Sequence, residues 1–325
     1  MKKVLKIILC AITVGVVIFA PAVAYKKTSS VESFPKTTPT YKTVVKLWNI
    51  DVFEGGIGSR GDFLSKVSLG FKGSGTLVMV ISHTVESAKK SVEKGEIPDI
   101  VSFGVGVDFL TPYVKKLSET EFKGGENGGQ TYAYPWCRGG YFLITKTEDN
   151  QPIDQLIVSQ NEYNMPYGAI NMSKLSAIDT VFEEPLKAYT DFLSGKGALL
   201  GTQRDIWRLQ KRGVSFFAKP LEKFCDLIQY VAVTTCEESK FSVCHDFCKY
   251  LLSNGVQNKI TEIGMFPMKN NPYADGLGQY QLKNTEYTVS PFTSAQFIKE
   301  LNKEFTAQKI TNDSLLRFKN VLKRL

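Results

Sequence analysis

Histidine is nearly absent from this sequence, and so are the residue patterns of the common hydrolases. The 325 residues include two histidines, His83 and His245. Neither a G-x-S-x-G elbow nor an H-E-x-x-H motif occurs. Because histidine is the side chain that most often transfers protons near neutral pH, its scarcity leaves few general bases. The sequence therefore argues against a serine hydrolase, a zinc protease and, more broadly, an enzyme.

The cysteine pattern of a zinc site is missing as well, since the sequence has no paired CxxC elements. Cys244 and Cys248 stand four residues apart in a segment of helical pattern. An odd number of cysteines follows the N-terminal segment, so they cannot all pair within one chain; they are Cys137, Cys225, Cys236, Cys244 and Cys248. We expect buried thiols or a single disulfide, with no metal site and no cofactor.

Dense runs of lysine and arginine are also lacking. The formal net charge is +8; Lys2, Lys3 and Lys6 lie in the N-terminal segment, and 8 − 3 leaves +5 for the rest. This charge is spread thinly and is not interleaved with aromatic residues, so a nucleic acid is not the expected partner. Hydrophobic residues make up 43% and charged residues 22% of the chain, which is typical of a folded globular protein.

The N-terminus has the pattern of an export signal. A basic start is followed by the apolar stretch Ile7–Ala20 and by Ala22-Val23-Ala24. This predicts a signal peptide over residues 1–24, cleaved after Ala24. An uncleaved membrane anchor is the alternative, because the apolar segment is nearly long enough to span a bilayer. Residues 25–43, rich in Lys, Thr, Ser and Pro, resemble a flexible tether. We expect an exported protein that is secreted, periplasmic or held at the cell surface.

The first half of the body alternates strand and helix patterns. Apolar runs predict strands at Val44–Ile50, Leu77–Ser82 and Pro98–Gly104. Ser59 is an N-cap candidate for a helix that follows the glycine-rich turn after the first strand, and Val85–Lys94 is a second helix. This order predicts an α/β fold with a parallel sheet, whose ligands bind beyond the carboxyl ends of the strands.

The remaining segments are assigned from the same patterns. Asn164–Asp179 is polar and is expected to be irregular. Extended segments are predicted at 131–136, 139–146, 197–202, 227–234 and 264–268. Helices are predicted at 113–117, 153–162, 183–195, 203–211, 237–252 and 256–263, with two more from Pro291 to Leu325.

Several segments in their order resemble a known family. These are LWNIDVFEGGIGSR, EKGEIPDIVSFGVG, YAYPW with GGYFLITK, FLSGKGALLGTQRDIWRL, DLIQYVAV and ITEIGMFPM. Between about Val44 and Pro272 the chain resembles the extracellular solute-binding proteins of ABC importers, in the branch related to sugar and maltodextrin binders. The resemblance implies a two-lobe periplasmic-binding-protein-like fold with a hinge and a central ligand cleft, which closes around a solute.

The resemblance also implies a partner and a division of the chain. A monomer would deliver its small-molecule solute, with a carbohydrate favoured, to the permease subunits and would perform no chemistry. The hinge is expected at Trp136–Gly140, at Ala232–Thr235 and after Met268. The expected parts are 44–138 for the first lobe, 139–231 for the second, 232–268 for the first again, and 269–325 as a C-terminal part that belongs mainly to the second.

Aromatic and polar side chains near the expected strand ends and hinge are the candidate ligand contacts. An aromatic ring covers the apolar face of a sugar, and planar polar groups bond its hydroxyls. The candidates are Trp48, Asn49, Asp51, Glu54, Arg60, Phe103, Gly104, Tyr134, Trp136, Thr202, Gln203, Arg204, Met265 and Phe266. Trp136 is the preferred stacking residue because it follows a proline at the first crossing, and Trp48 is the alternative. Core packing for Trp48, and salt bridges for Arg60 and Arg204, are competing interpretations.

Two other functions stay open at this stage. The same fold would serve a sensor that presents its solute to a membrane receptor. An exported glycoside hydrolase would need a carboxylate pair drawn from Asp51, Glu54, Asp99 and Asp205, and nothing in the sequence sets their separation. The ligand is open too: Arg204 at a helix start would suit an anion, and related binders accept polyamines, metal chelates, phosphate esters or peptides.

Overall fold

The computed structural model describes residues 41–71, 75–148, 152–235, 237–269 and 285–325. Contacts divide the chain into two compact units, 1–41 and 42–325. Only Tyr41 of the first unit is described, so the predicted signal peptide and most of the tether lie outside the described residues. In the part that is described, no helix has the length and apolar character needed to span a membrane.

One sheet of the second unit opens with the parallel strands that the sequence predicts. β1 pairs in parallel with β2 and with β3, and β12 runs antiparallel between β3 and β6. The sheet order is β13-β6-β12-β3-β1-β2. The strands are β1 (Thr43–Ile50), β2 (Thr76–His83), β3 (Ile100–Phe103), β6 (Tyr134–Arg138), β12 (Ile228–Val233) and β13 (Phe266–Pro267).

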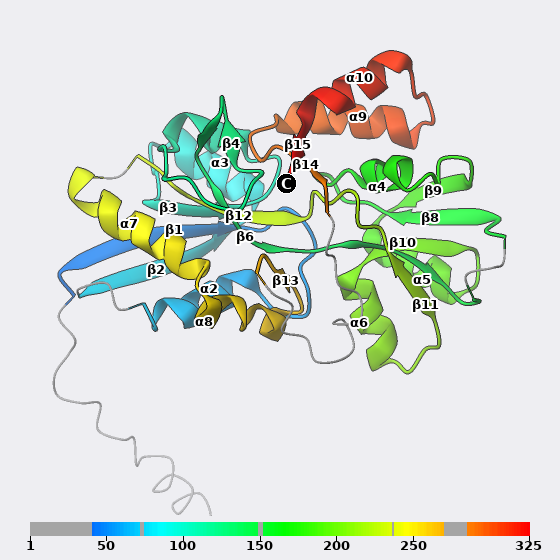
Figure 1. Ribbon diagram of the computed structural model, residues 1–325, viewed down its shortest axis with the longest axis horizontal. Coiled ribbons are helices and arrows are strands. Elements are labelled where there is room, and N and C mark those ends of the chain that lie inside the picture. Colours follow the sequence, from blue (N-terminus) through cyan, green and yellow to red (C-terminus); the bar gives the residue numbers. More distant parts are fainter. Residues whose placement is uncertain (1–40, 72–74, 149–151, 236, 270–284) are drawn as a thin grey trace, which may run out of the picture. The chain divides into compact units, whose positions relative to one another are not determined.

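Helices cover both faces of this sheet, and together they form the first lobe. Figure 1 shows α3 on one face and α2 with α8 on the other. As predicted, Ser59 caps α2, because its Oγ accepts a hydrogen bond from the Asp62 N–H at 3.1 Å. The helices are α2 (Arg60–Ser68), α3 (Val85–Glu93), α7 (Glu238–Leu251) and α8 (Asn254–Gln257), with a 3-10 turn η2 (Ile260–Ile263) after α8.

A second sheet with its own helices forms the second lobe. Its order is β11-β7-β10-β8-β9, with β8 parallel to both β10 and β9. Its strands are β7 (Tyr141–Thr145), β8 (Gln155–Ser159), β9 (Asp179–Glu183), β10 (Ala198–Thr202) and β11 (Phe217–Pro220). Its helices are α4 (Pro166–Met172), α5 (Pro185–Leu193) and α6 (Gln203–Lys211). A reciprocal capping box between Thr202 and Asp205 begins α6 where the sequence predicts it.

Three predicted elements are wrong. The segment 153–162 was expected to be helical but contains β8, whose Leu156, Ile157 and Val158 are buried in succession between two neighbouring strands. A strand covered on both faces carries such an unbroken apolar run, which periodicity cannot tell from a helix. The segment 164–179, expected to be irregular, contains α4, with Pro166 in its first turn. The helix expected at 113–117 is replaced by the 3-10 helix η1 (Asp108–Tyr113) just before it.

The chain passes between the sheets at two described places. The first is Gly139-Gly140, between β6 and β7, within the expected hinge segment. The second is 221–227, between β11 and β12, because β12 has entered the first sheet by Ile228. The crossing expected at Ala232–Thr235 therefore lies too late: Ala232 and Val233 already pair with β3. The third, expected after Met268, falls mainly among residues 270–284, outside the described residues.

The C-terminal segment adds two helices that pack on the second lobe, as Phe305 of α9 stacks on Tyr167 of α4 at 3.9 Å between ring centroids. The same segment touches the first lobe, where the backbone N–H of Ala295 donates to Asp108 at 3.1 Å. These helices are α9 (Ala295–Thr306) and α10 (Asn312–Val321). Two short antiparallel strand pairs complete the described structure: β4 (Glu126–Asn127) with β5 (Gln130–Thr131), and β14 (Tyr287–Val289) with β15 (Leu322–Arg324).

Candidate functional site: a cleft at the strand ends of both sheets

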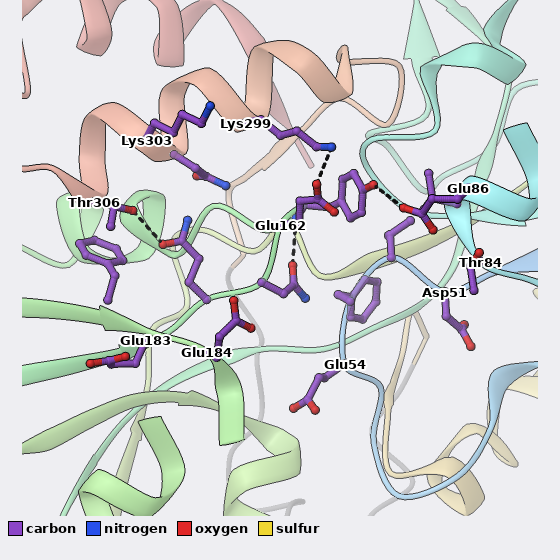
Figure 2. Close-up of a pocket in the computed structure, with 18 of the residues that line it drawn as sticks. Asp51, Glu54, Thr84, Glu86, Glu162, Glu183, Glu184, Lys299, Lys303 and Thr306 are labelled. Carbon is purple, nitrogen blue, oxygen red and sulfur yellow. Dashed lines mark hydrogen bonds and ion pairs between the residues drawn. The ribbon is translucent and has the colours of Figure 1, made fainter. Parts of the chain in front are cut away.

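A cavity of about 1540 Å³ lies between the two lobes (Figure 2). Its first wall is made of residues 51–54 and 82–86, which follow or end β1 and β2. Its second wall is made of residues 160–163 and 182–184, which follow or end β8 and β9, and α9 closes a further side. Both walls therefore use the carboxyl ends of parallel strands, the place where open α/β sheets bind ligands.

Carboxylates dominate the charged groups of this cleft. Two lysines, Lys299 and Lys303, and one histidine, His83, also line it. The carboxylates are Asp51, Glu54, Glu86, Glu162, Glu183 and Glu184. Counting full charges with neutral histidine, the lining carries −6 + 2 = −4. Arg60, Arg204 and Lys187 pair with three of these carboxylates from outside the lining, so the charge left to act on a ligand is −4 + 3 = −1. A net negative charge favours cations over anions.

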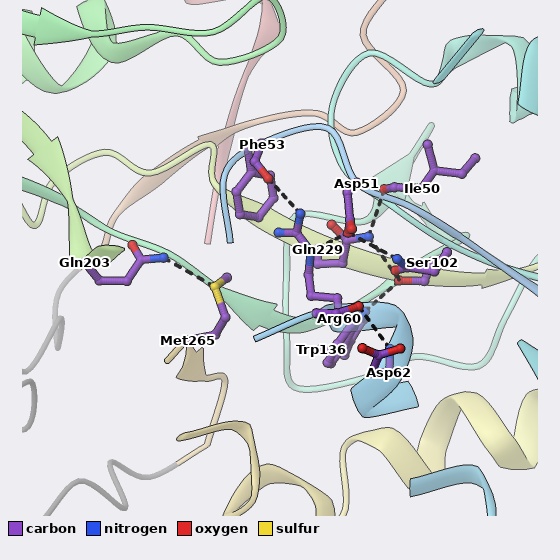
Figure 3. A network of polar contacts seen from close by, with 12 residues as sticks. Ile50, Asp51, Phe53, Arg60, Asp62, Ser102, Trp136, Gln203, Gln229 and Met265 are labelled. Carbon is purple, nitrogen blue, oxygen red and sulfur yellow. Dashed lines mark hydrogen bonds and ion pairs between the residues drawn. The ribbon is translucent and has the colours of Figure 1, made fainter. Parts of the chain in front are cut away.

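Arg60 fixes the first wall from behind. Its side chain is 3% exposed. Its Nε donates to Asp51 at 2.6 Å and its Nη2 donates to the Phe53 carbonyl at 2.7 Å. The guanidinium also lies 4.2 Å from the centre of the Phe53 ring, a cation–π contact. Because one buried cation holds both an acid and the backbone, the loop after β1 is positioned before any ligand arrives (Figure 3).

Polar contacts tie the two lobes together on both sides of the cleft. Glu54 of the first lobe pairs with Arg204 at 3.1 Å and with Arg208 at 3.7 Å, both on α6 of the second lobe. On the other side the Tyr163 hydroxyl donates to Glu86 at 3.5 Å. These contacts are partly exposed, so each contributes little free energy on its own and is open to exchange with a ligand.

The protonation states of two cleft residues follow from their surroundings. Burial lowers the pKa of His83, and nearby Glu96 raises it in part. The imidazole is therefore neutral at pH 7 and adds no positive charge to the cleft. A hydrogen bond from its own backbone N–H lowers the pKa of Glu86, so this side chain is a carboxylate at neutral pH.

Four of the fourteen candidate residues from the sequence line cavities. Asp51 and Glu54 line the cleft, and they also line an adjoining cavity of about 380 Å³ together with Arg60 and Arg204. The other ten line neither cavity, and all are buried: Trp48, Asn49, Phe103, Gly104, Tyr134, Trp136, Thr202, Gln203, Met265 and Phe266.

Trp136 differs most from its expected position. It lies within β6 and is 0% exposed. Its Nε1 donates to Ser102 at 3.2 Å, and its ring stacks on Phe63 at 5.8 Å between centroids. The proline before it marks a strand of the sheet and not an exposed crossover, so the ring is enclosed by α2. Trp48 is 4% exposed and lies one layer behind the cleft, where it packs against His83 at 4.5 Å between ring centroids.

Two more of the buried candidates form hydrogen bonds inside the protein, one of them at a crossing. The Gln203 side chain accepts a hydrogen bond from the Gly140 N–H at 2.9 Å, and so holds the first passage between the lobes. Tyr134 bonds to His245 at 2.9 Å. These polar atoms are satisfied inside the protein, which explains their placement without a ligand.

Sequence reasoning missed most of the second wall. Gln160, Asn161, Glu162 and Tyr163 follow β8 directly. Polar residues after a buried parallel strand are the signal that would have found them, and the helical assignment of 153–162 concealed it. The contribution of α9 carries no local signal, because only the tertiary fold brings this helix to the cleft.

The two sheets, their crossings and the cleft at the strand ends define the two-lobe α/β fold of the periplasmic binding proteins. Within this class, the chain is similar to maltose-bound MalE3 of T. maritima, with 12% identity and a TM-score of 0.56 over 85% of this chain and 97% of that one. It is also similar to iron-bound HitA of Pseudomonas aeruginosa, with 13% identity and a TM-score of 0.55 over 81% and 99%.

A third similar structure is a eukaryotic thiaminase-I bound to the thiamin analogue 3-deazathiamin, with 11% identity and a TM-score of 0.53 over 79% and 97% of the two chains. No family profile and no curated protein matches the chain. At these identities the likeness shows the fold. The resemblance seen in the sequence is thus confirmed at the level of the two-lobe fold, and that fold also occurs in an enzyme.

Proposed function

We propose that the protein binds a small extracellular solute in the cleft and delivers it to the permease of an ABC importer. The observation that carries the proposal is that the cleft takes its polar groups from both lobes, so a ligand held there favours closure. Export, predicted from residues 1–24, and a monomeric state belong to the same proposal.

A carbohydrate is the solute class that we propose first. The rings of Phe53 and Phe182 line the cleft, and rings of this kind cover the apolar face of a sugar. The side-chain NH2 groups of Gln160 and Asn161 supply donors for hydroxyl groups, because their amide oxygens already accept hydrogen bonds inside the protein. The carboxylates beside them supply acceptors. The sequence resemblance to sugar binders points to the same class.

We infer binding without catalysis. Of the four carboxylates considered for a glycosidase pair, Asp51 and Glu54 line the cleft, whereas Asp99 and Asp205 do not. Burial raises the pKa of Asp205 to about 6, but its carboxylate is used inside the protein, where it accepts the Thr202 N–H at 2.8 Å. The ion pairs of Asp51 and Glu54 occupy them as acceptors. If chromatography showed that a bound sugar is hydrolysed, the inference of binding without catalysis would be contradicted.

The test is a thermal-shift screen of sugars, amino acids, polyamines and phosphate esters, followed by calorimetric titration of any hit. A ligand that binds the folded state alone stabilises it by about 2.7 kcal/mol at a hundredfold excess over Kd. Small-angle scattering with a bound solute should show a smaller radius of gyration.

Site variants separate the cleft from the rest of the surface. Combined Gln160→Ala and Asn161→Ala should weaken binding at least about tenfold, because two hydrogen-bonding groups are lost. Asn254→Ala, at the exposed start of α8, is the matched control and should bind normally. Stabilisation by no solute class, or binding that survives the double variant, would count against the cleft.

A further inference from the structure

The carboxylates of the cleft differ in whether a cation already pairs with them. Arg60 pairs with Asp51 and Arg204 with Glu54. Lys299 pairs with Glu162 at 2.5 Å, and Lys187 with Glu183 at 2.5 Å. Glu86 and Glu184 have no cation within ion-pair distance among the residues that the structure describes. Two negative charges are therefore left over, Glu86 on the first wall and Glu184 on the second.

The cleft also contains a buried hydrogen-bond acceptor that has no donor among the described residues. Asn302 of α9 lines the cleft and is 7% exposed. Its Nδ2 donates to the Asn164 carbonyl at 2.9 Å, which fixes the orientation of the amide. Its Oδ1 has no hydrogen-bond partner in the described part of the chain. A buried acceptor without a donor costs about 1–3 kcal/mol, so a ligand that supplies an N–H or O–H would recover that free energy.

One lysine in the cleft, Lys303, disfavours a positively charged ligand. Lys303 of α9 is exposed and forms no ion pair with any described residue. It stands one helical turn from Lys299, whose charge Glu162 already neutralises. Lys303 therefore opposes a bound cation. Removing the charge of Lys303 should therefore strengthen the binding of a positive ligand, whereas removing the charge of Glu184 should weaken it.

We propose that the solute carries at least one protonated amino group, attracted by the unpaired carboxylates Glu86 and Glu184, which line opposite walls of the cleft. This inference rests on the proposed function and specifies its ligand. An amino sugar would satisfy both the ring-stacking and the charge requirement. A positive group between two carboxylates on different lobes would also favour closure, because each carboxylate is drawn toward it.

The experiment compares matched probes that differ in charge. Glucosamine and spermidine are the positive probes, glucose and N-acetylglucosamine the neutral ones, and glucuronate the negative one. Calorimetric titration of the full chain at about pH 6, where an amine is protonated, should give at least about tenfold tighter binding for a positive probe than for the neutral sugars. Raised salt should weaken that binding, because exposed charges are screened.

Two variants test the sign of the effect. Glu184→Gln should weaken binding of the positive probe roughly two- to fivefold, as expected for one exposed charge pair, and Lys303→Gln should strengthen it by a similar factor. Glu93→Gln, an exposed glutamate at the end of α3 outside the cleft, is the matched control and should change nothing.

The outcomes are distinct. A positive probe that binds more tightly, with opposite signs in the two variants, supports the inference. Equal or tighter binding of a neutral or negative probe, or variants without opposite signs, overturns it and leaves solute binding intact. Binding by none of the probes overturns the inference; the proposed function then fails as well if the wider solute screen is also negative.

Discussion

Two sets of polar and aromatic residues lie close together in the first lobe and have different roles. Behind the cleft, Asn49, Ser102, Trp136 and Gln229 form a buried network: Gln229 donates to Ser102 at 3.0 Å, and Ser102 donates to Asn49 at 3.3 Å. In the cleft, by contrast, Glu86 and its neighbours face solvent. The first set supports the fold, because hydrogen bonds inside the protein join its members and leave Gln229 Oε1 as the one acceptor of the network without a partner among the described residues. The second set has capacity left for a ligand.

The largest effect is expected when Trp136 is removed from the buried network, which tests whether that network supports the fold. The sequence suggested a ligand-stacking residue, whose removal would weaken binding more than stability; its complete burial leads us to expect a large loss of stability in Trp136→Ala instead. The variant should lose about 3–5 kcal/mol of unfolding free energy, because a large cavity replaces a packed indole and Ser102 loses its donor. Chemical denaturation measures the loss.

Trp207→Ala is the matched control for this indole. Trp207 is half-buried on α6 and contacts Lys211 at 4.8 Å from its ring centre. Its removal should cost about 1 kcal/mol or less. Nearly wild-type stability in Trp136→Ala would mean that the network behind the cleft does not support the fold.

A buried carboxyl outside this network, Asp226 in the second crossing, predicts that stability depends on pH. Burial raises its pKa to about 6, although the Tyr141 hydroxyl and the Met165 N–H donate to it. Because the folded state holds this proton more tightly than the unfolded state, its contribution is present below about pH 4. It is lost as pH rises through 6, by at most about 3 kcal/mol.

Asp226→Asn should remove that part of the slope between about pH 4 and 7. The measurement is unfolding free energy against pH, compared with wild type and with the exposed control Asp62→Asn. Subtracting the curves matters, because Asp205, with its pKa also raised to about 6, adds a slope of the same sign. An unchanged slope in Asp226→Asn would show that this carboxyl does not titrate as its burial implies.

The same comparison shows which features could be read from the sequence. The βαβ opening was predictable, because Val44–Ile50 and Leu77–Ser82 are apolar runs and Ser59 is a strong cap. Asp51 and Glu54 were found because they directly follow such a run. Composition near a strand end does not reveal whether a side chain faces the core or the cleft, and Trp136 was misplaced for that reason.

The second wall could not be predicted for a different reason. β8 is an unbroken apolar run covered on both faces, so it carries no alternation that would distinguish it from a helix. Once it was assigned as a helix, Gln160–Tyr163 no longer stood at a strand end. Asn302 and Lys303 reach the cleft through tertiary packing of α9, which no local pattern encodes.

A smaller effect is expected at Arg60, which holds the Asp51 side chain and the Phe53 carbonyl from behind the cleft. Arg60→Met keeps much of the side-chain volume but removes the bonds to Asp51 and to the Phe53 carbonyl. We expect a loss of about 1–3 kcal/mol in stability, because the Phe53 carbonyl loses its charged donor while Asp51 remains solvated. Solute affinity should fall as well, since the loop after β1 is no longer fixed. Denaturation and calorimetry on one preparation measure both; a loss of stability with unchanged affinity would separate the loop from binding.

The smallest effect on stability is expected at Glu54, and it tests the cleft side of the comparison. Glu54 pairs with Arg204 at 3.1 Å and Arg208 at 3.7 Å, with all three side chains partly exposed. Glu54→Gln should therefore cost about 1 kcal/mol or less in unfolding free energy. It should, however, loosen the contact between the lobes, since Glu54 of the first lobe pairs with arginines of the second. Small-angle scattering without solute should then show a larger radius of gyration than for wild type.

Glu262→Gln removes an exposed ion pair with Lys66 that stays within the first lobe, so it controls for loss of charge alone. If the two variants have the same radius of gyration without solute, the ion pairs of Glu54 do not hold the lobes together. Glu54 would then be available as a ligand contact in the unliganded protein.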